Sequence, residues 1–309
     1  MGKTVFMFAG QGAQYPDMAK DLYEHFPIIR ETFAEANQVL GYELEDLIFS
    51  ENSKLNETQY TQPAILTVDV AIARLLIDQG IQPEAALGLS LGEYAALVIA
   101  GAIDFQAAVA LIAKRGQYMS EAAPTGTGKM VAVMNTPIET IEAACAQASE
   151  KGIVSPANYN TPQQVVIGGE AQAVDYADEL LKAAGSKRLI ELNVSGPFHT
   201  ALLQPASEKL AMALNLVEFK PLQIPVVSNT TAQFFELEDI PTLLTRQVMT
   251  PVRFFESINT LIIKGFDTFI EIGPGKTLTG FMKKIDKSQT TYRVENIETL
   301  NTLLDIGEK

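Results

Sequence analysis

The hydrophobic and polar positions of this chain alternate between two patterns: short runs rich in β-branched and aromatic residues, and longer stretches with helical spacing. The first run, residues 3–8, ends at a glycine-rich turn, as expected of a buried strand. Pro63 should lie near the first position of its helix, where the missing N–H costs nothing. Strands that alternate with helices predict a parallel sheet covered by helices. The expected order is a strand over 3–8, helices at about 17–37 and 62–79, a strand over 84–90, and helices over 91–100 and 105–122.

A different rhythm follows Pro124–Gly128, a stretch whose composition is typical of a linker. The order of elements after it, strand–helix–strand–strand–helix–strand, is typical of a ferredoxin-like fold that can stand as a small subdomain. The pattern predicts strands over Met130–Met134, Ile153–Ala157, Val165–Ile167 and Arg188–Leu192, with helices over Ile138–Ala148 and Ala171–Ala184.

The larger pattern resumes after this segment, so the small subdomain is interpreted as an insertion. We therefore predict the α/β class, with residues 1–125 and 197–309 in one large domain and residues 126–196 as the inserted subdomain. In the second part of the large domain, helices are expected near 200–214, 239–247 and 251–264, strands near 224–228 and 267–272, and a last helix from about Gly275.

Composition and charge narrow the functional classes. The chain has 309 residues, 47% of them hydrophobic and 19% charged, so it can bury a sizeable core. A net charge of −14 disfavours nucleic-acid binding, which needs a basic surface. The single cysteine, Cys145, cannot form an internal disulfide and fits a reducing cytoplasm. With two histidines and one cysteine no metal site is expected, and no apolar run is long enough for a membrane span.

Ser90 is the candidate nucleophile. It lies in Gly88-Leu-Ser-Leu-Gly92, a GxSxG motif at the expected junction of a strand with a helix. The glycines allow a sharp turn that exposes the serine hydroxyl, and the helix N-terminus favours a developing negative charge. The Leu91 backbone N–H would be one oxyanion donor. The alternative interpretation is a tight turn in which Ser90 only caps the helix.

His199 is the candidate base. The other histidine, His25, lies at the end of a charged helix and is interpreted as a surface residue. His199 follows a Ser-Gly-Pro-Phe loop that would deliver it to the start of the next helix, and catalytic groups concentrate on such loops. No acidic residue lies at a recognisable triad spacing. The hypothesis is therefore a Ser–His dyad whose histidine is oriented by a backbone carbonyl.

Further motifs occur in a characteristic order around these two residues. They are Phe8-Ala-Gly-Gln-Gly-Ala-Gln14, Thr61-Gln-Pro-Ala64, the Ser90 elbow, Arg115-Gly-Gln117, Gly196-Pro-Phe-His199 and Glu271-Ile-Gly-Pro-Gly275. Together they resemble the malonyl-CoA:acyl carrier protein transacylases of bacterial fatty acid synthesis, over essentially the whole chain. The resemblance implies an α/β-hydrolase-like parallel-sheet core with an inserted ferredoxin-like (βαββαβ) subdomain, in agreement with the segmentation above.

The resemblance also implies roles for the matching residues. Ser90 would take the malonyl group and His199 would activate it. Gln11 would supply a backbone N–H to the oxyanion hole beside that of Leu91. The Arg115 guanidinium would bind the free malonyl carboxylate, because its fork can pair with a planar carboxylate through two hydrogen bonds.

Three more positions follow from the same resemblance, and one position departs from it. The backbone carbonyl of Gln247 would orient the histidine, and Gln62 would line the substrate pocket. Phe198 suggests a pocket that prefers malonyl over the bulkier methylmalonyl group. The family usually has a histidine immediately before the nucleophile, whereas this chain has Leu89.

The implied function is malonyl-CoA:acyl carrier protein S-malonyltransferase, a ping-pong reaction through an acyl-Ser90 enzyme that needs no cofactor or metal. The expected partners are malonyl-CoA and holo acyl carrier protein, and a cytoplasmic monomer is expected. Two alternatives stay open: a serine thioesterase or hydrolase on the same elbow, and a catalytically silent scaffold that binds acyl carrier protein. Arg115 and the insert argue against the first. Because carrier proteins are typically acidic, the candidate docking residues are Lys187, Arg188, Lys283, Lys284 and Lys287.

Overall fold

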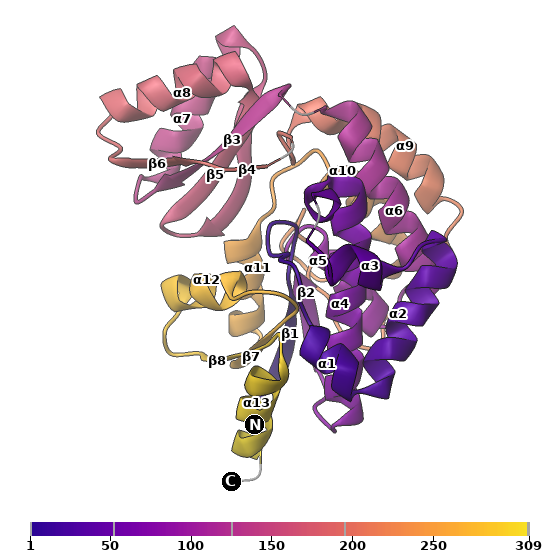
Figure 1. Ribbon diagram of the computed structural model, residues 1–309. Helices are drawn as coiled ribbons and strands as arrows, with labels where there is room; N and C mark the ends of the chain where they lie inside the picture. The colour runs from indigo at the N-terminus through magenta and orange to yellow at the C-terminus, as the bar shows by residue number, and fades with distance from the viewer. Residues whose placement is uncertain (1, 52, 125, 195, 308–309) are drawn as a thin grey trace.

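Two separate β-sheets, each with its own helices, organise the computed structural model, which describes residues 2–51, 53–124, 126–194 and 196–307 (Figure 1). The first part contains β1 (Thr4–Phe8), α1 (Lys20–His25), α2 (Pro27–Leu40), α3 (Leu44–Ile48), η1 (Lys54–Asn56), α4 (Thr58–Asp78), β2 (Ala85–Gly88), α5 (Gly92–Ile99) and α6 (Phe105–Ala122). The middle part contains β3 (Gly128–Met134), α7 (Ile138–Ala148), η2 (Ser149–Lys151), β4 (Val154–Thr161), β5 (Gln164–Glu170), α8 (Ala171–Ala183) and β6 (Arg188–Glu191). The last part contains η3 (Ala201–Leu203), α9 (Gln204–Leu214), η4 (Leu237–Asp239), α10 (Ile240–Gln247), α11 (Phe254–Ile263), β7 (Thr268–Ile272), α12 (Thr277–Ile285), β8 (Thr290–Val294) and α13 (Ile297–Gly307).

The larger sheet has the strand order β2-β1-β7-β8, and all of its neighbouring strands are parallel. Its central strand β1 is buried along its whole length, as a strand covered by helices on both faces should be. Because the strands are parallel, the loops after β1 and β2 leave the sheet at the same edge. The α/β class predicted from the sequence is confirmed, and this edge brings the loop after β1 close to the Ser90 elbow.

The smaller sheet is antiparallel, with the strand order β4-β5-β3-β6. Its strands and helices follow the predicted order, and α7 and α8 pack on it around a separate apolar cluster that includes Val133, Ile141, Ile167 and Val174. Figure 1 shows this subdomain as a separate unit at the upper left, above the larger sheet. The ferredoxin-like subdomain is confirmed, while its limits at residues 126 and 196 stay a prediction.

Two helices differ from the predicted limits. The pattern over 17–37 is two helices, because the backbone becomes extended at Phe26 before Pro27 starts α2. Helix α4 starts at Thr58, so Pro63 lies inside it rather than at its first position. The additional turn is held by Thr61 Oγ1, which donates to the Leu55 carbonyl at 2.6 Å. The prediction for Pro63 was therefore wrong, and the earlier start extends α4 toward the loop after β1.

The C-terminal part contains more elements than the sequence pattern indicated. The helix expected near Gly275 is α12, and the strand β8 and the helix α13 follow it. Strand β8 has only one fully buried residue, Val294, because it lies at the edge of the sheet, so its sequence shows no strong apolar pattern. The strand expected near 224–228 is reduced to isolated bridges of Val226 with Ala86 and of Val227 with Phe234.

Helix α4 is long and apolar enough to cross a membrane by those two criteria alone. However, 83% of its most apolar window is buried inside the protein, as in the core helix of a globular domain.

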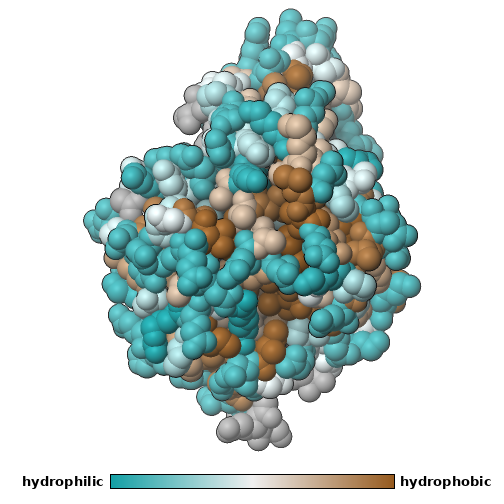
Figure 2. Space-filling model, turned by 90° about the vertical axis from the view of Figure 1, so that its right-hand side faces the viewer, coloured by the Kyte–Doolittle hydropathy of each residue, from teal (hydrophilic) through white to brown (hydrophobic). Residues whose placement is uncertain are grey.

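Figure 2 views the molecule from the right-hand side of Figure 1, with polar residues around the edge of this face and apolar residues gathered toward its middle.

Helices α4 and α6 approach each other closely at Gly116. A Cβ added there would lie 2.8 Å from the carbonyl oxygen of Thr58 and 2.9 Å from the Cα of Gln59. Such distances are shorter than ordinary van der Waals contact, so only glycine allows this approach. The contact places Arg115, the preceding residue of α6, opposite the first turns of α4.

We predict that Gly116→Ala lowers the free energy of unfolding by about 1–3 kcal/mol, because the added methyl group overpacks this contact. Gly280→Ala is the matched control, since a Cβ on this helical glycine of α12 would meet nothing within 4 Å. The control should raise the free energy of unfolding by about 0.5–1 kcal/mol through helix propensity. Urea denaturation followed by circular dichroism measures both variants, and equal effects would contradict the close α4–α6 contact.

Candidate active site

Ser90 lies on the sharp turn between β2 and α5, with a left-handed backbone at φ 55°. The turn is tight because its two glycines almost touch: a Cβ on Gly88 would lie 1.9 Å from the carbonyl carbon of Gly92. A Cβ on Gly92 would in turn lie 2.3 Å from the Phe8 carbonyl oxygen at the end of β1. Ser90 itself is partly exposed. The geometry is that of a nucleophile elbow, with the hydroxyl presented above the carboxyl ends of the strands.

His199 lies within hydrogen-bond distance of Ser90. The Ser90 Oγ is 2.8 Å from His199 Nε2, and His199 Nδ1 is 2.7 Å from the Gln247 backbone carbonyl oxygen. Because a carbonyl oxygen only accepts, Nδ1 carries the proton and Nε2 is free to accept the Ser90 proton. The structure thus brings Ser90, His199 and Gln247 together, with a carbonyl where a triad has a carboxylate.

The surroundings of His199 keep its imidazole neutral. The side chain is 4% exposed, and burial lowers its pKa to about 4, with the positive charge of Arg115 acting in the same direction. The hydrogen bond to Gln247 has the opposite, smaller effect. A neutral imidazole is the form that can accept a proton.

Arg115 projects from α6 into the site and is 1% exposed. Its Nη1 donates to Gln62 Oε1 at 2.7 Å, and its Nη2 donates to Gln247 Oε1 at 3.0 Å and to Ser90 Oγ at 3.2 Å. Its Nε has no hydrogen-bond partner within the described residues. All of these acceptors are neutral, so no carboxylate in the described part of the chain is bonded to the buried positive charge. Such a guanidinium is well suited to bind an anionic group.

Two backbone amides next to the elbow have no acceptor of their own among the described residues: Leu91 follows Ser90, and Gln11 follows Gly10, where an added Cβ would lie 2.5 Å from the Leu89 carbonyl oxygen. Across the part of the chain that the structure describes, the N–H groups of Gln11 and Leu91 donate to no other group. The Ser90 N–H, in contrast, donates to Asn229 Oδ1 at 2.7 Å and is already used. The Gln11 side chain is tied to α4, because it accepts from Gln62 Nε2 at 3.3 Å. Two free amides beside a nucleophile can stabilise an oxyanion.

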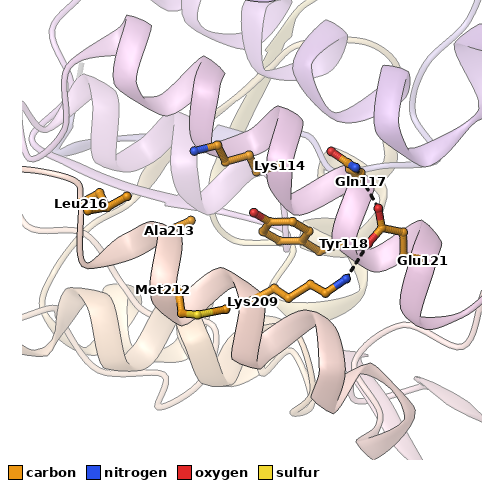
Figure 3. A pocket seen from close by; sticks show the side chains of 8 residues that line it. All are labelled: Lys114, Gln117, Tyr118, Glu121, Lys209, Met212, Ala213 and Leu216. Carbon is orange, nitrogen blue, oxygen red and sulfur yellow. Dashed lines mark hydrogen bonds and ion pairs between the residues drawn. The ribbon is translucent and has the colours of Figure 1, made fainter.

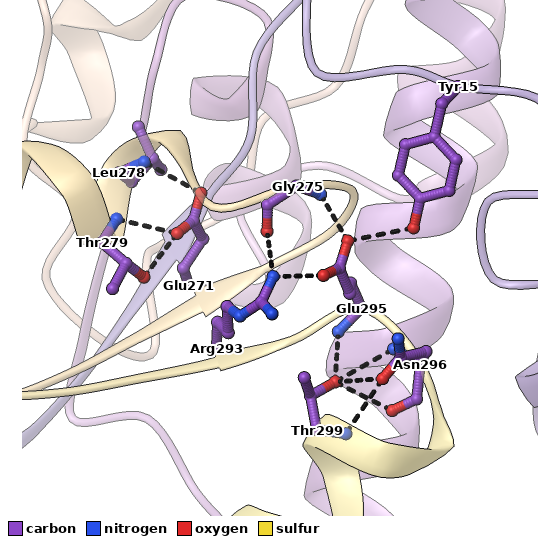
Figure 4. A network of polar contacts seen from close by, with 9 residues as sticks. All are labelled: Tyr15, Glu271, Gly275, Leu278, Thr279, Arg293, Glu295, Asn296 and Thr299. Atoms are coloured by element: carbon purple, nitrogen blue, oxygen red, sulfur yellow. Dashed lines mark hydrogen bonds and ion pairs between the residues drawn. The ribbon is translucent and has the colours of Figure 1, made fainter.

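A polar network behind the loop after β1 holds that loop in position (Figure 4). Glu295 accepts hydrogen bonds from the Tyr15 hydroxyl at 2.9 Å and from the Gly275 N–H at 2.8 Å, and it pairs with Arg293. Tyr15 lies four residues after Gln11. The network therefore connects the loop that carries the Gln11 amide to the C-terminal strand β8 and its neighbourhood.

Several residues complete the surroundings of the dyad. Phe198 precedes His199, is 8% exposed and packs into the main apolar cluster. The sequence analysis missed Glu93 and Asn229. The Asn229 side chain accepts from the Ser90 N–H, and the Asn229 N–H donates to the Glu93 carboxylate. Signals for both were present: Glu93 is the only charged residue in the apolar helix α5, and Asn229 directly follows the stretch 224–228 that was expected to be a strand.

A surface groove between α6 and α9 lies apart from these residues (Figure 3). In Figure 3 the Glu121 carboxylate of α6 meets Lys209 of α9, and the distance between the two charged groups is 2.6 Å. Lys114 lines this groove, whereas the next residue, Arg115, is buried at the dyad. Helix α6 thus has an outer face along the groove and an inner face at Ser90.

Comparison with known proteins shows which family has this arrangement. The acyl transferase domain matches residues 5–303. The malonyl CoA-acyl carrier protein transacylase of Bacillus subtilis is 44% identical over 97% of this chain and 96% of its own length. That of Escherichia coli is 42% identical over 99% of this chain and its full length. The chain belongs to the malonyl CoA-acyl carrier protein transacylase family.

Solved structures agree with this transacylase assignment. MCAT from Streptococcus pneumoniae is 60% identical and superimposes with a TM-score of 0.97, covering 98% of this chain and 100% of its own. A malonyl-transacylase in complex with its type II PKS acyl-carrier protein is 43% identical with a TM-score of 0.95, covering 98% and 99%. The transacylase fold, an α/β-hydrolase-like core with a ferredoxin-like subdomain, is therefore the fold of this chain, and the chain is an acyltransferase.

We predict that the rate of Ser90 acylation in this transacylase is constant from pH 7 down to about pH 5, because His199 stays neutral there. The rate should then fall with a midpoint near pH 4 as the imidazole is protonated. Burst-phase acylation by a thioester, followed by quenched-flow mass spectrometry, measures how the acylation rate falls at low pH.

The lowered pKa of His199 also determines how this residue affects the folding stability as the pH changes. Between pH 4 and 6.5 the unfolded chain binds a proton at His199 that the folded protein excludes, so this residue lowers the stability as the pH falls through that window. Circular dichroism at each pH separates unfolding from loss of rate. An acylation midpoint near 6.5 in the folded protein would show that His199 has the pKa of an exposed histidine.

Proposed function

We propose that this chain transfers the malonyl group from malonyl-CoA to the phosphopantetheine thiol of an acyl carrier protein, for fatty acid synthesis. The observation that carries the proposal is the buried guanidinium of Arg115, which lies 3.2 Å from the Ser90 hydroxyl and, over residues 2–51, 53–124, 126–194 and 196–307, has no bonded carboxylate. A hydrolase of uncharged acyl groups has no use for such a charge. A malonyl thioester has a free carboxylate that would pair with it through two hydrogen bonds.

In the first half-reaction, His199 Nε2 accepts the Ser90 proton and the serine oxygen attacks the thioester carbonyl. The Gln11 and Leu91 N–H groups stabilise the oxyanion that forms, a contribution typically of about 10²–10³-fold in rate for each donor. The intermediate collapses to malonyl-Ser90, and the protonated His199 gives its proton to the departing thiolate of coenzyme A. The Gln247 carbonyl holds the imidazole in the required tautomer throughout.

In the second half-reaction, the same groups act in reverse order. His199 takes the proton of the phosphopantetheine thiol, and the thiolate attacks the carbonyl of malonyl-Ser90. Collapse of this intermediate transfers malonyl to sulfur, and the serine oxygen recovers its proton from His199. Arg115 keeps the malonyl carboxylate in place during both steps, so the carbonyl stays beside the oxyanion donors. Gln62 and Phe198 would form part of the acyl pocket.

The proposed partners are malonyl-CoA and a holo acyl carrier protein, and the proposed setting is a monomer in the cytoplasm. Support comes from the solved relative that is described as a complex with its acyl-carrier protein. An acidic carrier would need a basic surface on this acidic chain. Lys283 and Lys284 are exposed in the last turn of α12, and Lys287 is exposed just after it. Lys187 and Arg188 are exposed at the start of β6, so all five residues stay candidates for the docking surface.

Intact-protein mass spectrometry after mixing with malonyl-CoA tests the function. We expect a single malonyl adduct on the wild type and none on Ser90→Ala, because the Ser90 hydroxyl is paired with the base His199. Holo acyl carrier protein should discharge the adduct and gain the malonyl group.

Other results would overturn the proposal in distinguishable ways. Release of free malonate without transfer to the carrier would identify a thioesterase. Malonyl-CoA left intact, with no adduct but with binding of the carrier, would identify a silent scaffold.

We expect Arg115→Ala to lower kcat/KM for malonyl-CoA by roughly 10²-fold, because the malonyl carboxylate loses its buried charge partner. Activity with acetyl-CoA, which lacks that carboxylate, should be unchanged or higher. Arg115→Lys should recover only part of the malonyl activity, since an ammonium cannot form the two parallel hydrogen bonds. Steady-state kinetics with malonyl-CoA and acetyl-CoA gives the ratio of the two kcat/KM values for each variant.

Arg74→Ala is the control for loss of an arginine that is partly buried but lies outside the site. Arg74 pairs with Glu35 at 2.8 Å and lies over the Phe105 ring, on α4 but away from Ser90. Arg74→Ala should lower the folding stability without changing the ratio of the activities with malonyl-CoA and acetyl-CoA. An equal loss with both thioesters in Arg115→Ala would remove Arg115 from carboxylate recognition.

A further inference from the structure

Asn229 holds the backbone on both sides of the nucleophile elbow. Its side-chain Oδ1 accepts from the Ser90 N–H at 2.7 Å, and its Nδ2 donates to the Gly88 carbonyl at 2.7 Å. The residue is fully buried, so neither bond competes with bulk water. Asn229 thus fixes the two peptide groups that flank Leu89 and define the left-handed turn.

Glu93 joins this contact to the residue that orients the histidine. It lies one turn after Ser90 in α5 and is fully buried. Its Oε1 accepts from the Asn229 N–H at 2.5 Å, and its Oε2 accepts from Gln247 Nε2 at 2.5 Å. The same Gln247 Nε2 also donates to the Ser90 carbonyl at 2.8 Å. One carboxylate therefore touches both supports of the dyad and touches neither reacting side chain.

We propose that Glu93 and Asn229 are positioning residues for the dyad, in which the Glu93 carboxylate fixes Ser90 through Asn229 and His199 through Gln247. The inference rests on the proposed function and names residues that would keep its reacting atoms aligned. Glu93 helps to orient the histidine, as the acid of a triad does in other enzymes, but it acts through Gln247 and not by direct contact with the imidazole.

The chemistry of the contacts explains why a carboxylate is needed. Both groups bonded to Glu93 are N–H donors, and a carboxylate offers an acceptor oxygen to each. A glutamine would turn its NH₂ group toward one of them and leave two donors facing each other. Burying a carboxylate is unfavourable, and burial raises the pKa of Glu93, but the hydrogen bonds from Asn229 and Gln247 and the charge of Arg115 lower that pKa and favour the ionised form. A group that is buried at such a cost, and whose carboxylate bonds among the described residues go to the supports of the dyad, is explained by positioning.

The test compares Glu93→Gln and Asn229→Asp with the wild type in two reactions of Ser90. The first is malonyl loading, with kcat and KM measured separately. The second is modification by phenylmethylsulfonyl fluoride, followed by intact-protein mass spectrometry, which needs the aligned dyad but not the Arg115 site. In both variants we expect roughly 10–10²-fold lower rates of both reactions, as for small displacements of reacting groups, with little change in KM for malonyl-CoA.

Glu271→Gln is the matched control, because Glu271 is also a buried glutamate that accepts N–H groups. It is 1% exposed and accepts from Leu278 and Thr279 at the start of α12. The control should lower the melting temperature while leaving the sulfonylation rate of the folded protein close to that of the wild type.

The positioning role is overturned if the folded Glu93→Gln and Asn229→Asp variants are sulfonylated as fast as the wild type. If Glu93→Gln does not fold, the Asn229→Asp rate alone decides. A wild type that reacts with the sulfonyl fluoride but not with malonyl-CoA would contradict the proposed function, and the sulfonylation comparison would still decide the positioning role.

Discussion

The left-handed backbone of the two dyad residues is the constraint on which the rest of the site depends. Ser90 has φ 55° and His199 has φ 60°, and neither is a glycine. Such conformations cost about 1–3 kcal/mol each and persist only where the surrounding structure over-determines them. Around Ser90, the contact of Gly88 with Gly92 closes the turn against the end of β1. Around His199, the backbone N–H is held by the Val248 carbonyl at 3.2 Å. The end of β1, the start of α5 and the C-terminal end of α10 thus stabilise the strained backbone conformations of the two dyad residues.

A second constraint is the arrangement of buried charge beside the dyad. Arg115 and Glu93 are both fully enclosed, yet no direct hydrogen bond joins them among the described residues. The Gln247 side chain lies between them, accepting from Arg115 at 3.0 Å and donating to Glu93 at 2.5 Å. If the two charges met directly, they would form a neutral pair and the guanidinium would be occupied. With the amide between them, Arg115 keeps its charge available beside Ser90, and Glu93 keeps both oxygens for the groups that hold the elbow.

The sequence predicted the features that a short stretch of residues determines, and it did not predict those that depend on contacts between distant parts of the chain. Strands and helices with their own apolar pattern were predicted, as was the Ser90 elbow, because five consecutive residues determine that turn. Strand β8 was missed because its structure comes from pairing with β7, not from its own polar sequence. Asn229 was missed for the same reason: its contact with Ser90 spans 139 residues of sequence. For Glu93 the apolar helix around it was a usable signal, but only the fold shows what its two oxygens bind.

The inserted subdomain is bound to the residues that hold the histidine. In β4, the Tyr159 N–H donates to the Val252 carbonyl at 2.8 Å, and the Val252 N–H donates to the Ala157 carbonyl at 2.9 Å. Val252 lies five residues after Gln247, whose carbonyl accepts the hydrogen bond from His199 Nδ1. The small sheet is therefore continued by the segment that orients the base. Because hydrogen bonds of this kind fix the register of neighbouring strands, the subdomain and the imidazole cannot shift independently. The insert is thus part of the support of the dyad, although it contributes neither of the two reacting side chains.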